Sequence, residues 1–332
     1  MRRKGCGQTT GDRYWFLFIG LLIGVSPLSV LFCSRGGYEV DRTEMAFGSY
    51  VRIRALGKDS IRVNRTVNEA FAEFHRLDSL WSCFYDGSEV VRLNRARRLM
   101  VSSETRDLIL KALEIGKRTE GVFDITVEPL MRLWGFFDES YRLPESSEIK
   151  KLLPRVGYER VVINGDTVML GDSVNIDLGG IAVGFAIDRA VALLKANGVQ
   201  GGLIDAGGDI RVFGERVWRI GVQNPRGEGV VQVLKLKNRA VATSGDYQKF
   251  FEKNGRRYCH IIDPRSGYPS DGCVAVTVVA PSALEADAYS TALFVMGPEK
   301  GLSWANKEGL GAIVFFLKDG VLVKKVVGRL NE

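Results

Sequence analysis

Three oxygen-bearing side chains are spaced to share one face of a helix expected over residues 283–296. Asp287, Ser290 and Thr291 stand at i, i+3 and i+4, close to the start of that helix. A carboxylate beside two hydroxyls offers the hard oxygen ligands that Mg²⁺ takes, and Mg²⁺ in turn binds phosphate oxygens. The structural alternative is that both hydroxyls bond back to the helix backbone while Asp287 favours the helix N-terminus. The residues alone leave both interpretations open.

A glycine turn between a strand and a helix is the second candidate. In IDLGGIAVGFAIDRA, residues 176–190, an expected strand ends at Asp177 and the chain turns through Gly179 and Gly180. Backbone groups at such a turn approach a ligand closely, and the start of the following helix favours anions. The spacing matches neither GxGxxG nor GxxxxGK[ST], so it indicates neither a Rossmann nor a P-loop site. A tight strand-to-helix connection is the plainer alternative.

One of the two histidines lies in a stretch rich in residues that could do chemistry. His260 belongs to RRYCHIIDPRSGYPS and is close to Asp263 and Arg265. We expect a strand that runs into a rigid loop, and loops that combine these residue types are frequent at active sites. Cys259 and His260 should not act as a nucleophile pair, because adjacent strand residues point to opposite faces. The other histidine, His75, falls inside an amphipathic helix and is interpreted as a surface or core residue.

An aromatic residue beside a carboxylate forms the fourth candidate. In GVFDITVEPL, residues 121–130, Phe123 and Asp124 precede Thr126. An exposed pair of this kind would stack on a flat heterocycle and hydrogen-bond to it. Ordinary core followed by a turn is the alternative that we favour for this segment taken alone.

The fold that must position these segments contains both strands and helices. Neighbouring strands look antiparallel and helices are inserted between them, so we predict an α+β fold with mixed or antiparallel sheets. Ser282 and Glu285, in capping-box spacing, start the helix that carries Asp287, and Gly297-Pro298 ends it. The expected elements are strands at 45–56, 174–177, 202–205, 217–223, 230–237 and 273–280, helices at 64–81, 103–119, 146–156, 182–197 and 283–296, and hairpins that turn at 164–165 and 319–320.

Composition indicates a folded body with mild basicity. The chain has 332 residues, of which 45% are hydrophobic and 26% charged, and its formal net charge is +7. No basic run interleaved with aromatics occurs, which argues against nucleic-acid binding, and a small anionic ligand explains the basicity equally well. The three cysteines beyond the N-terminal segment lack CxxC or Cys/His ligand spacing, so they indicate neither a disulfide framework nor a zinc site.

The N-terminal segment has the layout of an export signal. A basic head precedes the apolar run YWFLFIGLLIGVSPLSVLFC, residues 14–33, which approaches the roughly 20 residues that span a bilayer. Cys33 ends the run, as in a lipoprotein signal in which it would be lipidated. An uncleaved anchor is the alternative, because Phe32 stands where such signals carry a small residue. We expect residues 1–36 to be a signal, lipoprotein or membrane-anchor segment, and residues 37–332 to be an exported body anchored to the inner membrane and facing the periplasm.

Taken together, the candidate segments occur in the order and spacing of one family. From about Met45 to the C-terminus, the chain resembles the bacterial ApbE family of FAD:protein FMN transferases. The stretches that carry this resemblance are SEVVRLN at 88–94, VFDITVEPL at 122–130, DLGGIAVGFAIDRA at 177–190, LIDAGGDIR at 203–211, VATSGDYQKFF at 241–251, HIIDPRSG at 260–267 and EADAYSTALFVMG at 285–297. The resemblance implies an ApbE-like (T-fold-like) architecture for residues 37–332.

The resemblance also implies which residues form the site. An Mg²⁺ ion would be held by the backbone carbonyl of Gly180 and the side chains of Asp287, Ser290 and Thr291. The contacts to FAD carry over to Met45, Phe84, Val122, Phe123, Asp124, Asp177, Val183, His260 and Ile261.

The implied reaction passes FMN from FAD to a threonine of an acceptor protein and releases AMP. Mg²⁺ would neutralise the pyrophosphate and make AMP a better leaving group, which gives Asp287 a catalytic role. His260 is the candidate for proton transfer or for orienting the phosphate, with Asp263 and Asp246 as further helpers.

Two positions depart from the family pattern and leave the balance between transfer and hydrolysis open. Val183 stands where members usually carry a charged residue, commonly Lys, and Phe84 replaces a flavin-stacking tyrosine. The alternatives are a periplasmic FAD pyrophosphatase that yields FMN and AMP, and a flavin-binding lipoprotein without turnover. Retention of Asp287, Thr291 and His260 favours an enzyme over a mere binder.

Overall fold

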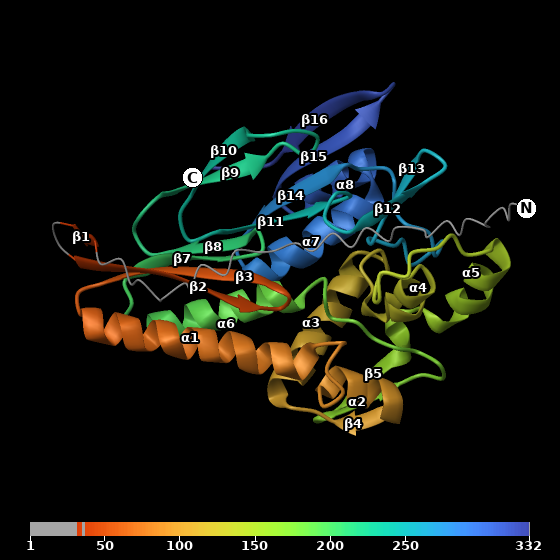
Figure 1. Cartoon of the computed structure of the whole chain (residues 1–332), viewed down its shortest axis with the longest axis horizontal. Coiled ribbons are helices and arrows are strands. Elements are labelled where there is room, and N and C mark those ends of the chain that lie inside the picture. Colours follow the sequence, from red (N-terminus) through yellow and green to blue (C-terminus); the bar gives the residue numbers. More distant parts are fainter. Residues whose placement is uncertain (1–31, 35–36, 332) are drawn as a thin grey trace, which may run out of the picture.

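A nine-stranded sheet forms the centre of the molecule (Figure 1). The structure is a computed structural model that describes residues 32–34 and 37–331. All neighbouring strands in this sheet are antiparallel. In sheet order the strands are β1 (Phe32–Ser34), β2 (Gly37–Ala46), β3 (Ser49–Gly57), β7 (Gly201–Ala206), β8 (Asp209–Phe213), β11 (Ala240–Gly245), β14 (Ala275–Ala280), β15 (Gly311–Lys318) and β16 (Val321–Val327). Helices join these strands, which confirms the predicted α+β class.

Helices cover one face of this sheet and a two-stranded hairpin covers the other (Figure 1). Strand β14 is buried at every position, since Val276 and Val278 pack under the helices while Ala275 and Val279 pack under the hairpin. Two covered faces explain why its sequence, AVTVVA, lacks the polar alternation of a half-exposed strand. The helices are α1 (Ser60–Trp81), α6 (Ala182–Ala196), α7 (Ala283–Met296) and α8 (Pro298–Lys307), and the hairpin is β9 (Trp218–Gln223) with β10 (Val230–Leu236).

A smaller group of elements packs beside the sheet and carries the loops that reach the site (Figure 1). Trp134 joins two of these loops, because its indole N–H donates to the carbonyl of Gly267 at 2.9 Å and its ring stacks on Tyr258. The elements are α2 (Glu89–Ala96), α3 (Ser103–Arg118), α4 (Glu128–Leu133), α5 (Ser146–Leu152), the 3₁₀ turns η1 (Ile125–Val127), η2 (Leu153–Arg155) and η3 (Tyr158–Arg160), the sheet β4 (Arg98–Met100), β6 (Thr167–Leu170) and β5 (Val161–Asn164), and the hairpin β12 (Phe250–Lys253) with β13 (Arg256–Cys259).

Helices α6 and α7 approach each other closely at the start of α7. The carboxylate of Asp188 on α6 accepts hydrogen bonds from the backbone N–H groups of Ala283 and Leu284, at 2.9 and 3.1 Å. These are donors that the first turn of a helix leaves without intrahelical partners. A Cβ built on Gly184 would lie 2.5 Å from the carbonyl oxygen of Ala283, so only glycine fits there. The α6–α7 contact therefore fixes where the face of α7 that carries Asp287 points.

Most predicted elements are present, with ends that differ by a few residues. Helix α7 spans 283–296 as predicted, and Ser282 caps it by accepting from the N–H of Glu285 at 3.2 Å. The predicted hairpin turns at 164–165 and 319–320 are confirmed. The helix predicted over 146–156 is shorter, because the chain passes into η2 after residue 152.

Two strand predictions are wrong. The segment 45–56 is not one strand, because Phe47 and Gly48 take positive φ and form the turn of the β2–β3 hairpin. Residues 174–177 form no strand. The side chain of Asn94 bonds both backbone groups of Ile176, at 2.8 and 2.9 Å, and so takes the place of a partner strand.

The predicted targeting segment, residues 1–36, lies outside the described residues except for 32–34. There the backbone of Cys33 pairs with that of Tyr38 between β1 and β2. Within the ranges that the structure describes, no helix has the length and apolar character needed to cross a bilayer.

We predict that Gly184→Ala lowers the free energy of unfolding by about 1–3 kcal/mol, because the added methyl overpacks the α6–α7 contact. Urea unfolding followed by circular dichroism measures this change. Ala192→Ser, at an exposed position of the same helix, is the matched control and should stay within about 0.5 kcal/mol of the parent. Equal stability of the two variants would contradict the close contact.

Candidate active site

One cavity of about 630 Å³ brings together the four segments that the sequence singled out. The glycine turn and α7 meet at its floor, since a Cβ built on Gly180 would lie 3.9 Å from Thr291 Oγ1 and 3.4 Å from the ring of Phe123. Met45 does not line the cavity and is 66% exposed on β2. The other predicted site residues all line it, namely Phe84, Val122, Phe123, Asp124, Asp177, Gly180, Val183, His260, Ile261, Asp287, Ser290 and Thr291.

A cluster of hydroxyl groups lies where α7 faces the end of β11. Ser244 Oγ is 2.7 Å from Ser290 Oγ and 3.2 Å from Thr291 Oγ1. Ser290 also donates to the backbone carbonyl of Asp287 at 2.9 Å, which is the bond expected of a structural serine in a helix. Thr291 makes no such bond and is only partly buried, so its hydroxyl oxygen is the better placed of the two to meet a ligand.

The carboxylate of Asp287 is buried without a compensating cation. Its Oδ2 accepts from the backbone N–H of Gly184 at 3.1 Å, and within the described part of the chain no Lys, Arg or His forms an ion pair with it. Burial raises the pKa of Asp287 to about 7. Asp209, which also lines the cavity, has a pKa well above its ordinary value because of burial and the charge of Asp287. The cavity is lined by five aspartates and a single lysine, Lys249, so its acidic groups outnumber its basic ones.

These donors fit a divalent cation with a preference for oxygen. A carboxylate, a threonine hydroxyl and a backbone carbonyl at a glycine turn form the kind of set that Mg²⁺ accepts, together with phosphate oxygens and water. Among the described residues no cluster of three or more His, Cys, Asp or Glu side chains could hold a metal, so a zinc-type cage is not what this cavity offers. The buried carboxyl group of Asp287, which has no ion-pair partner among the described residues, is the observation that a bound cation would explain.

His260 is held as a neutral imidazole. Its Nδ1 lies 3.2 Å from the carbonyl oxygen of Lys249, and burial lowers the pKa of the ring to about 4. A carbonyl only accepts hydrogen bonds, so Nδ1 carries the proton and Nε2 keeps its lone pair. The arrangement therefore presents a proton acceptor at neutral pH.

The acidic neighbours that the sequence offered as helpers are engaged elsewhere. Asp263 forms an ion pair with Arg265 at 2.8 Å, and Asp246 pairs with Arg226 and Arg257. Neither aspartate lines the cavity. Their contacts indicate that they hold loops in place.

Two aspartates of the cavity wall also shape the backbone around them. Asp124 accepts from the backbone N–H groups of Thr126 and Tyr158, both at 2.8 Å, and so ties the loop before α4 to a neighbouring loop. Asp177 accepts from the N–H of Gly179 and from the thiol of Cys83, both at 3.1 Å. Burial and the charge of Asp177 raise the pKa of the Cys83 thiol, which makes it a donor here and not a nucleophile.

Aromatic rings surround the mouth of the cavity. Phe84 is 73% exposed, and its ring centroid lies 5.9 Å from that of Phe137. Deeper in the wall, Trp81 packs edge-on against Phe185 at 5.4 Å. A flat ligand would find exposed ring faces at the mouth and a firm aromatic wall behind them.

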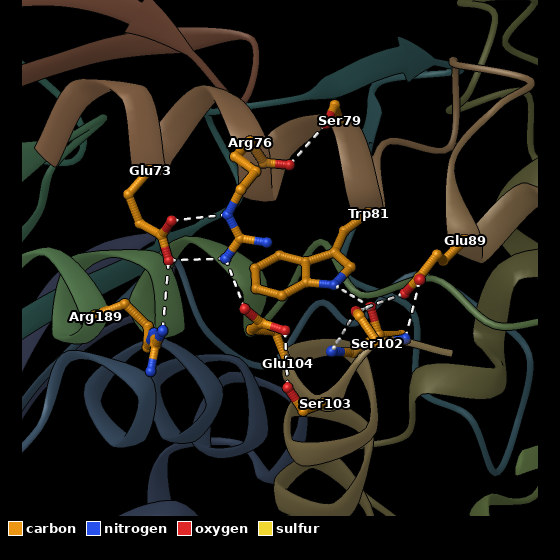
Figure 2. A network of polar contacts seen from close by, with 10 residues as sticks. Glu73, Arg76, Ser79, Trp81, Glu89, Ser102, Ser103, Glu104 and Arg189 are labelled. Carbon is orange, nitrogen blue, oxygen red and sulfur yellow. Dashed lines mark hydrogen bonds and ion pairs between the residues drawn. The ribbon is translucent and has the colours of Figure 1, made fainter. Parts of the chain in front are cut away.

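Polar contacts between four helices hold Trp81 in that wall (Figure 2). Its indole N–H donates to Thr105 Oγ1 at 2.9 Å, beside Ser102, which is bonded in turn to Glu89. Arg76 of α1 pairs with Glu73 on its own helix and with Glu104 of α3, and Arg189 of α6 approaches Glu73. The cavity wall is therefore anchored to the helical layer of the fold.

The sequence reasoning missed several residues of the cavity. Asp209 follows the glycine pair of LIDAGGDIR, and Ser244 lies in VATSGDYQKFF, so both fall in stretches that carried the family resemblance. Their types gave no separate signal, because a lone serine in a strand and an aspartate after a turn are common structural residues.

Together the fold and the cavity define a class of protein. It is an α+β protein whose central sheet and helices enclose an oxygen-lined cavity with an aromatic mouth. Such a site suits a ligand that has both anionic and flat aromatic parts.

The sequence pattern of the ApbE family matches residues 47–314. Similar relatives include the FAD:protein FMN transferases of Haemophilus influenzae, 30% identical over 93% of this chain and 95% of that protein, and of Escherichia coli K12, 32% identical over 82% of each. The chain belongs to the ApbE family, which confirms the resemblance found in the sequence.

Solved structures agree with this assignment. The ApbE protein of Thermotoga maritima matches with a TM-score of 0.80 and 35% identity, covering 86% of this chain and 96% of that one. The flavinyl transferase ApbE of Pseudomonas stutzeri matches with a TM-score of 0.81 and 31% identity, covering 88% and 95%. These values confirm an ApbE-like fold.

The raised pKa of Asp287 predicts that the metal-free chain loses stability as pH rises from about 4 to about 7. In this window the unfolded carboxyl is ionised while the folded one keeps its proton, so the folded state binds more protons. Asp287→Asn should flatten this part of the profile and stabilise the metal-free chain at pH 8 by about 1–4 kcal/mol. Urea unfolding in chelator at several pH values measures the slope.

Asp319→Asn, in an exposed turn, is the control and should keep the parental pH profile. An Asp287→Asn chain with the parental slope would contradict the assignment of this pKa.

Proposed function

We propose that this chain is an Mg²⁺-dependent FAD:protein FMN transferase that attaches FMN to a threonine hydroxyl of an acceptor protein and releases AMP. The names of its relatives support FAD as the substrate and a protein as the acceptor. The metal, the threonine and the leaving AMP are our proposal for this chain. The observation that carries it is the meeting of the glycine turn and the oxygen face of α7 in one cavity.

The pyrophosphate of FAD would lie at the N-terminus of α6, beside α7. Helix α6 has no side-chain cap at Ile181. The backbone N–H groups of Ile181 and Ala182 donate to the carbonyl of Leu178, so among the described residues the N–H of Val183 is the one in this first turn that is left for an anionic ligand. The backbone N–H of Gly184 is already used by Asp287. Val183 lines the cavity without a charge, so in this chain the helix end and the bound metal would supply most of the attraction for phosphate.

The metal would be held by Asp287, Thr291 and the carbonyl of Gly180, with Ser290 supporting the helix face. When bound, Mg²⁺ supplies positive charge that offsets the pyrophosphate and stabilises the departing AMP. The flavin ring would stack at the mouth against Phe84, where exposed aromatic faces are available.

The transfer step forms one bond to phosphorus and breaks another. The acceptor hydroxyl oxygen forms a bond to the FMN-side phosphorus, and the bond from that phosphorus to the bridging oxygen breaks, so that AMP leaves with the bridging oxygen. Nε2 of His260 takes the proton of the hydroxyl, because it is the unprotonated ring nitrogen. Water in place of the hydroxyl would give hydrolysis of FAD to FMN and AMP by the same atoms.

One experiment tests this proposal against its alternatives. The chain is incubated with FAD, Mg²⁺ and a threonine-containing acceptor domain, and mass spectrometry follows the acceptor while chromatography follows AMP and FMN. A gain of one FMN on the acceptor supports transfer, whereas free FMN with AMP and no adduct indicates a pyrophosphatase. Intact FAD would indicate a flavin-binding protein without turnover.

In the Asp287→Ala variant, the rate of AMP release should fall by at least about 10²-fold while flavin binding persists, because a metal ligand is removed and the aromatic mouth is intact.

We predict that His260→Ala lowers kcat for transfer by about 10²–10⁴-fold with a smaller change in KM for FAD, because proton removal is lost while binding contacts persist. His75→Ala is the matched control and should keep parental kinetics, since His75 lies on the exposed side of α1 beside Glu44. Equal losses in binding and turnover for His260→Ala would contradict the role of proton acceptor.

We also propose that the body is exported and held at the inner membrane facing the periplasm, by residues 1–36 or by a lipid on Cys33. The basic head and the apolar run at 14–33 support this location. Fractionation of cells that express the full chain, with Cys33→Ala to separate the two modes of anchoring, tests it.

A further inference from the structure

A second cavity, of about 350 Å³, lies on the other side of α4 from the candidate active site. It is formed by the end of α2, by α4, by the junction of α5 with η2, and by the loop at 173–175. Three arginines line it together with a single acidic residue, Glu128. Leu133 and Leu152 give it apolar sides. We call it the arginine cavity.

The charges in the arginine cavity do not balance. Glu128 is 3% exposed, and its carboxylate is used by Arg132 at 2.6 Å and by the side-chain amide of Asn175 at 3.0 Å. Among the residues that the structure describes, the side chain of Arg97 bonds only neutral oxygens, the carbonyl of Val174 and the side chain of Asn175. Two guanidinium groups are thus left without a counter-charge in the cavity.

Arg155 has the least satisfied guanidinium of the three. Within residues 37–331, no hydrogen bond or ion pair forms between its side chain and another residue, although the residue is partly buried at the end of η2. A guanidinium carries five N–H donors in a fork that matches a carboxylate. Arg155 therefore lacks a partner that an anionic ligand would supply.

The arginine cavity and the active-site cavity share α4 as a wall. Met131 faces the active site, whereas Glu128 and Arg132 face the arginine cavity. The guanidinium of Arg132 also lies 4.8 Å above the ring of Phe137, which belongs to the aromatic mouth. A macromolecule that presents a hydroxyl at the mouth would therefore pass close to the arginine cavity.

The two cavities are also joined through the backbone. Asn175 lies in the arginine cavity, and two residues further on Asp177 opens the glycine turn of the active site. Asn94 clamps Ile176 between them. A ligand that binds Asn175 and the arginines would therefore contact the segment that leads into the glycine turn.

We propose that the arginine cavity binds a carboxylate side chain of the acceptor protein, an aspartate or glutamate at a fixed distance from the threonine that receives FMN. This inference rests on the proposed function. The anionic groups of FAD are already placed at the start of α6, so the acceptor is the partner left to bring a carboxylate to this wall. The apolar sides of the cavity suit the methylene groups of such a side chain better than a bare inorganic anion.

A displayed peptide library with one fixed threonine in random flanking sequence tests the inference without a known acceptor. The full-length chain labels the library in the presence of FAD and Mg²⁺, and the flavin-bearing peptides are captured and sequenced. We expect Asp and Glu to be enriched at one fixed offset from the threonine, and labelling of such a peptide to be about tenfold faster than that of its amide analogue, as one charge-assisted pair predicts. Arg155→Gln should abolish this preference and Arg155→Lys should restore part of it.

Two controls separate this inference from the proposed function. Release of AMP from FAD in the absence of peptide should be unchanged in Arg155→Gln, since this residue lies outside the active-site cavity. Arg219→Gln, which removes the same charge from an exposed position on β9, should keep the peptide preference. Labelled peptides without any acidic preference, or a preference that survives in Arg155→Gln, would overturn the inference while leaving transfer intact.

Direct binding gives a second readout that does not depend on transfer. N-acetyl-aspartate methylamide, its asparagine counterpart and inorganic phosphate are each titrated into the full-length ¹⁵N-labelled chain, and the Nε–H signal of Arg155 is followed by NMR. The signal is identified by its loss in Arg155→Gln. We expect the aspartyl compound alone to shift it. A shift with phosphate only would mean a free-anion site, and equal shifts with the aspartyl and asparaginyl compounds would mean no carboxylate recognition, so either result would overturn the proposal.

Discussion

A carboxylate buried without a cation is the constraint on which the rest of the site depends. Asp287 lies at the start of α7, and a single backbone N–H, that of Gly184, is the hydrogen-bond donor to its side chain among the described residues. Burial of a charged group in this way is costly unless a counter-charge arrives or the group keeps a proton. The raised pKa of Asp287 expresses this cost in the metal-free chain. Under the proposed function, a bound cation would offset this cost.

The fold places that carboxylate by close helix packing. Gly184 lets α6 approach α7 to a distance that a methyl group would prevent, and Asp188 holds the start of α7 through two backbone N–H groups. The start of α6 is thereby aimed at the same cavity as the oxygen face of α7. One contact between two helices thus positions both the oxygen-bearing face of α7 and the start of α6 at the same cavity.

Local patterns in the sequence predicted the elements that carry the site, but not all of the contacts between them. The capping signals at Ser282 and Gly297 bound α7 correctly because caps act within a few residues. The strand predicted at 174–177 fails because its polar partner is the side chain of Asn94, which lies far away in the sequence. Ser244 and Asp209 escaped notice for the same reason, since only the fold brings them to α7. The family resemblance predicted more of the site than residue spacing did, because long motifs in a fixed order reflect contacts between segments that no single helix or strand reveals.

The hydrogen bond between His260 and the carbonyl of Lys249 has a consequence for how a proton would travel. A carbonyl orients the ring, but it lacks the full negative charge with which a carboxylate would stabilise an imidazolium. A second proton on this ring is therefore bound weakly and is readily lost. In the proposed reaction, His260 would not keep this proton. It would pass the proton to the most basic oxygen nearby once the phosphate bond has broken, which is that of the departing nucleotide. In the proposed reaction, this transfer would return the ring to its neutral form at the end of each turnover.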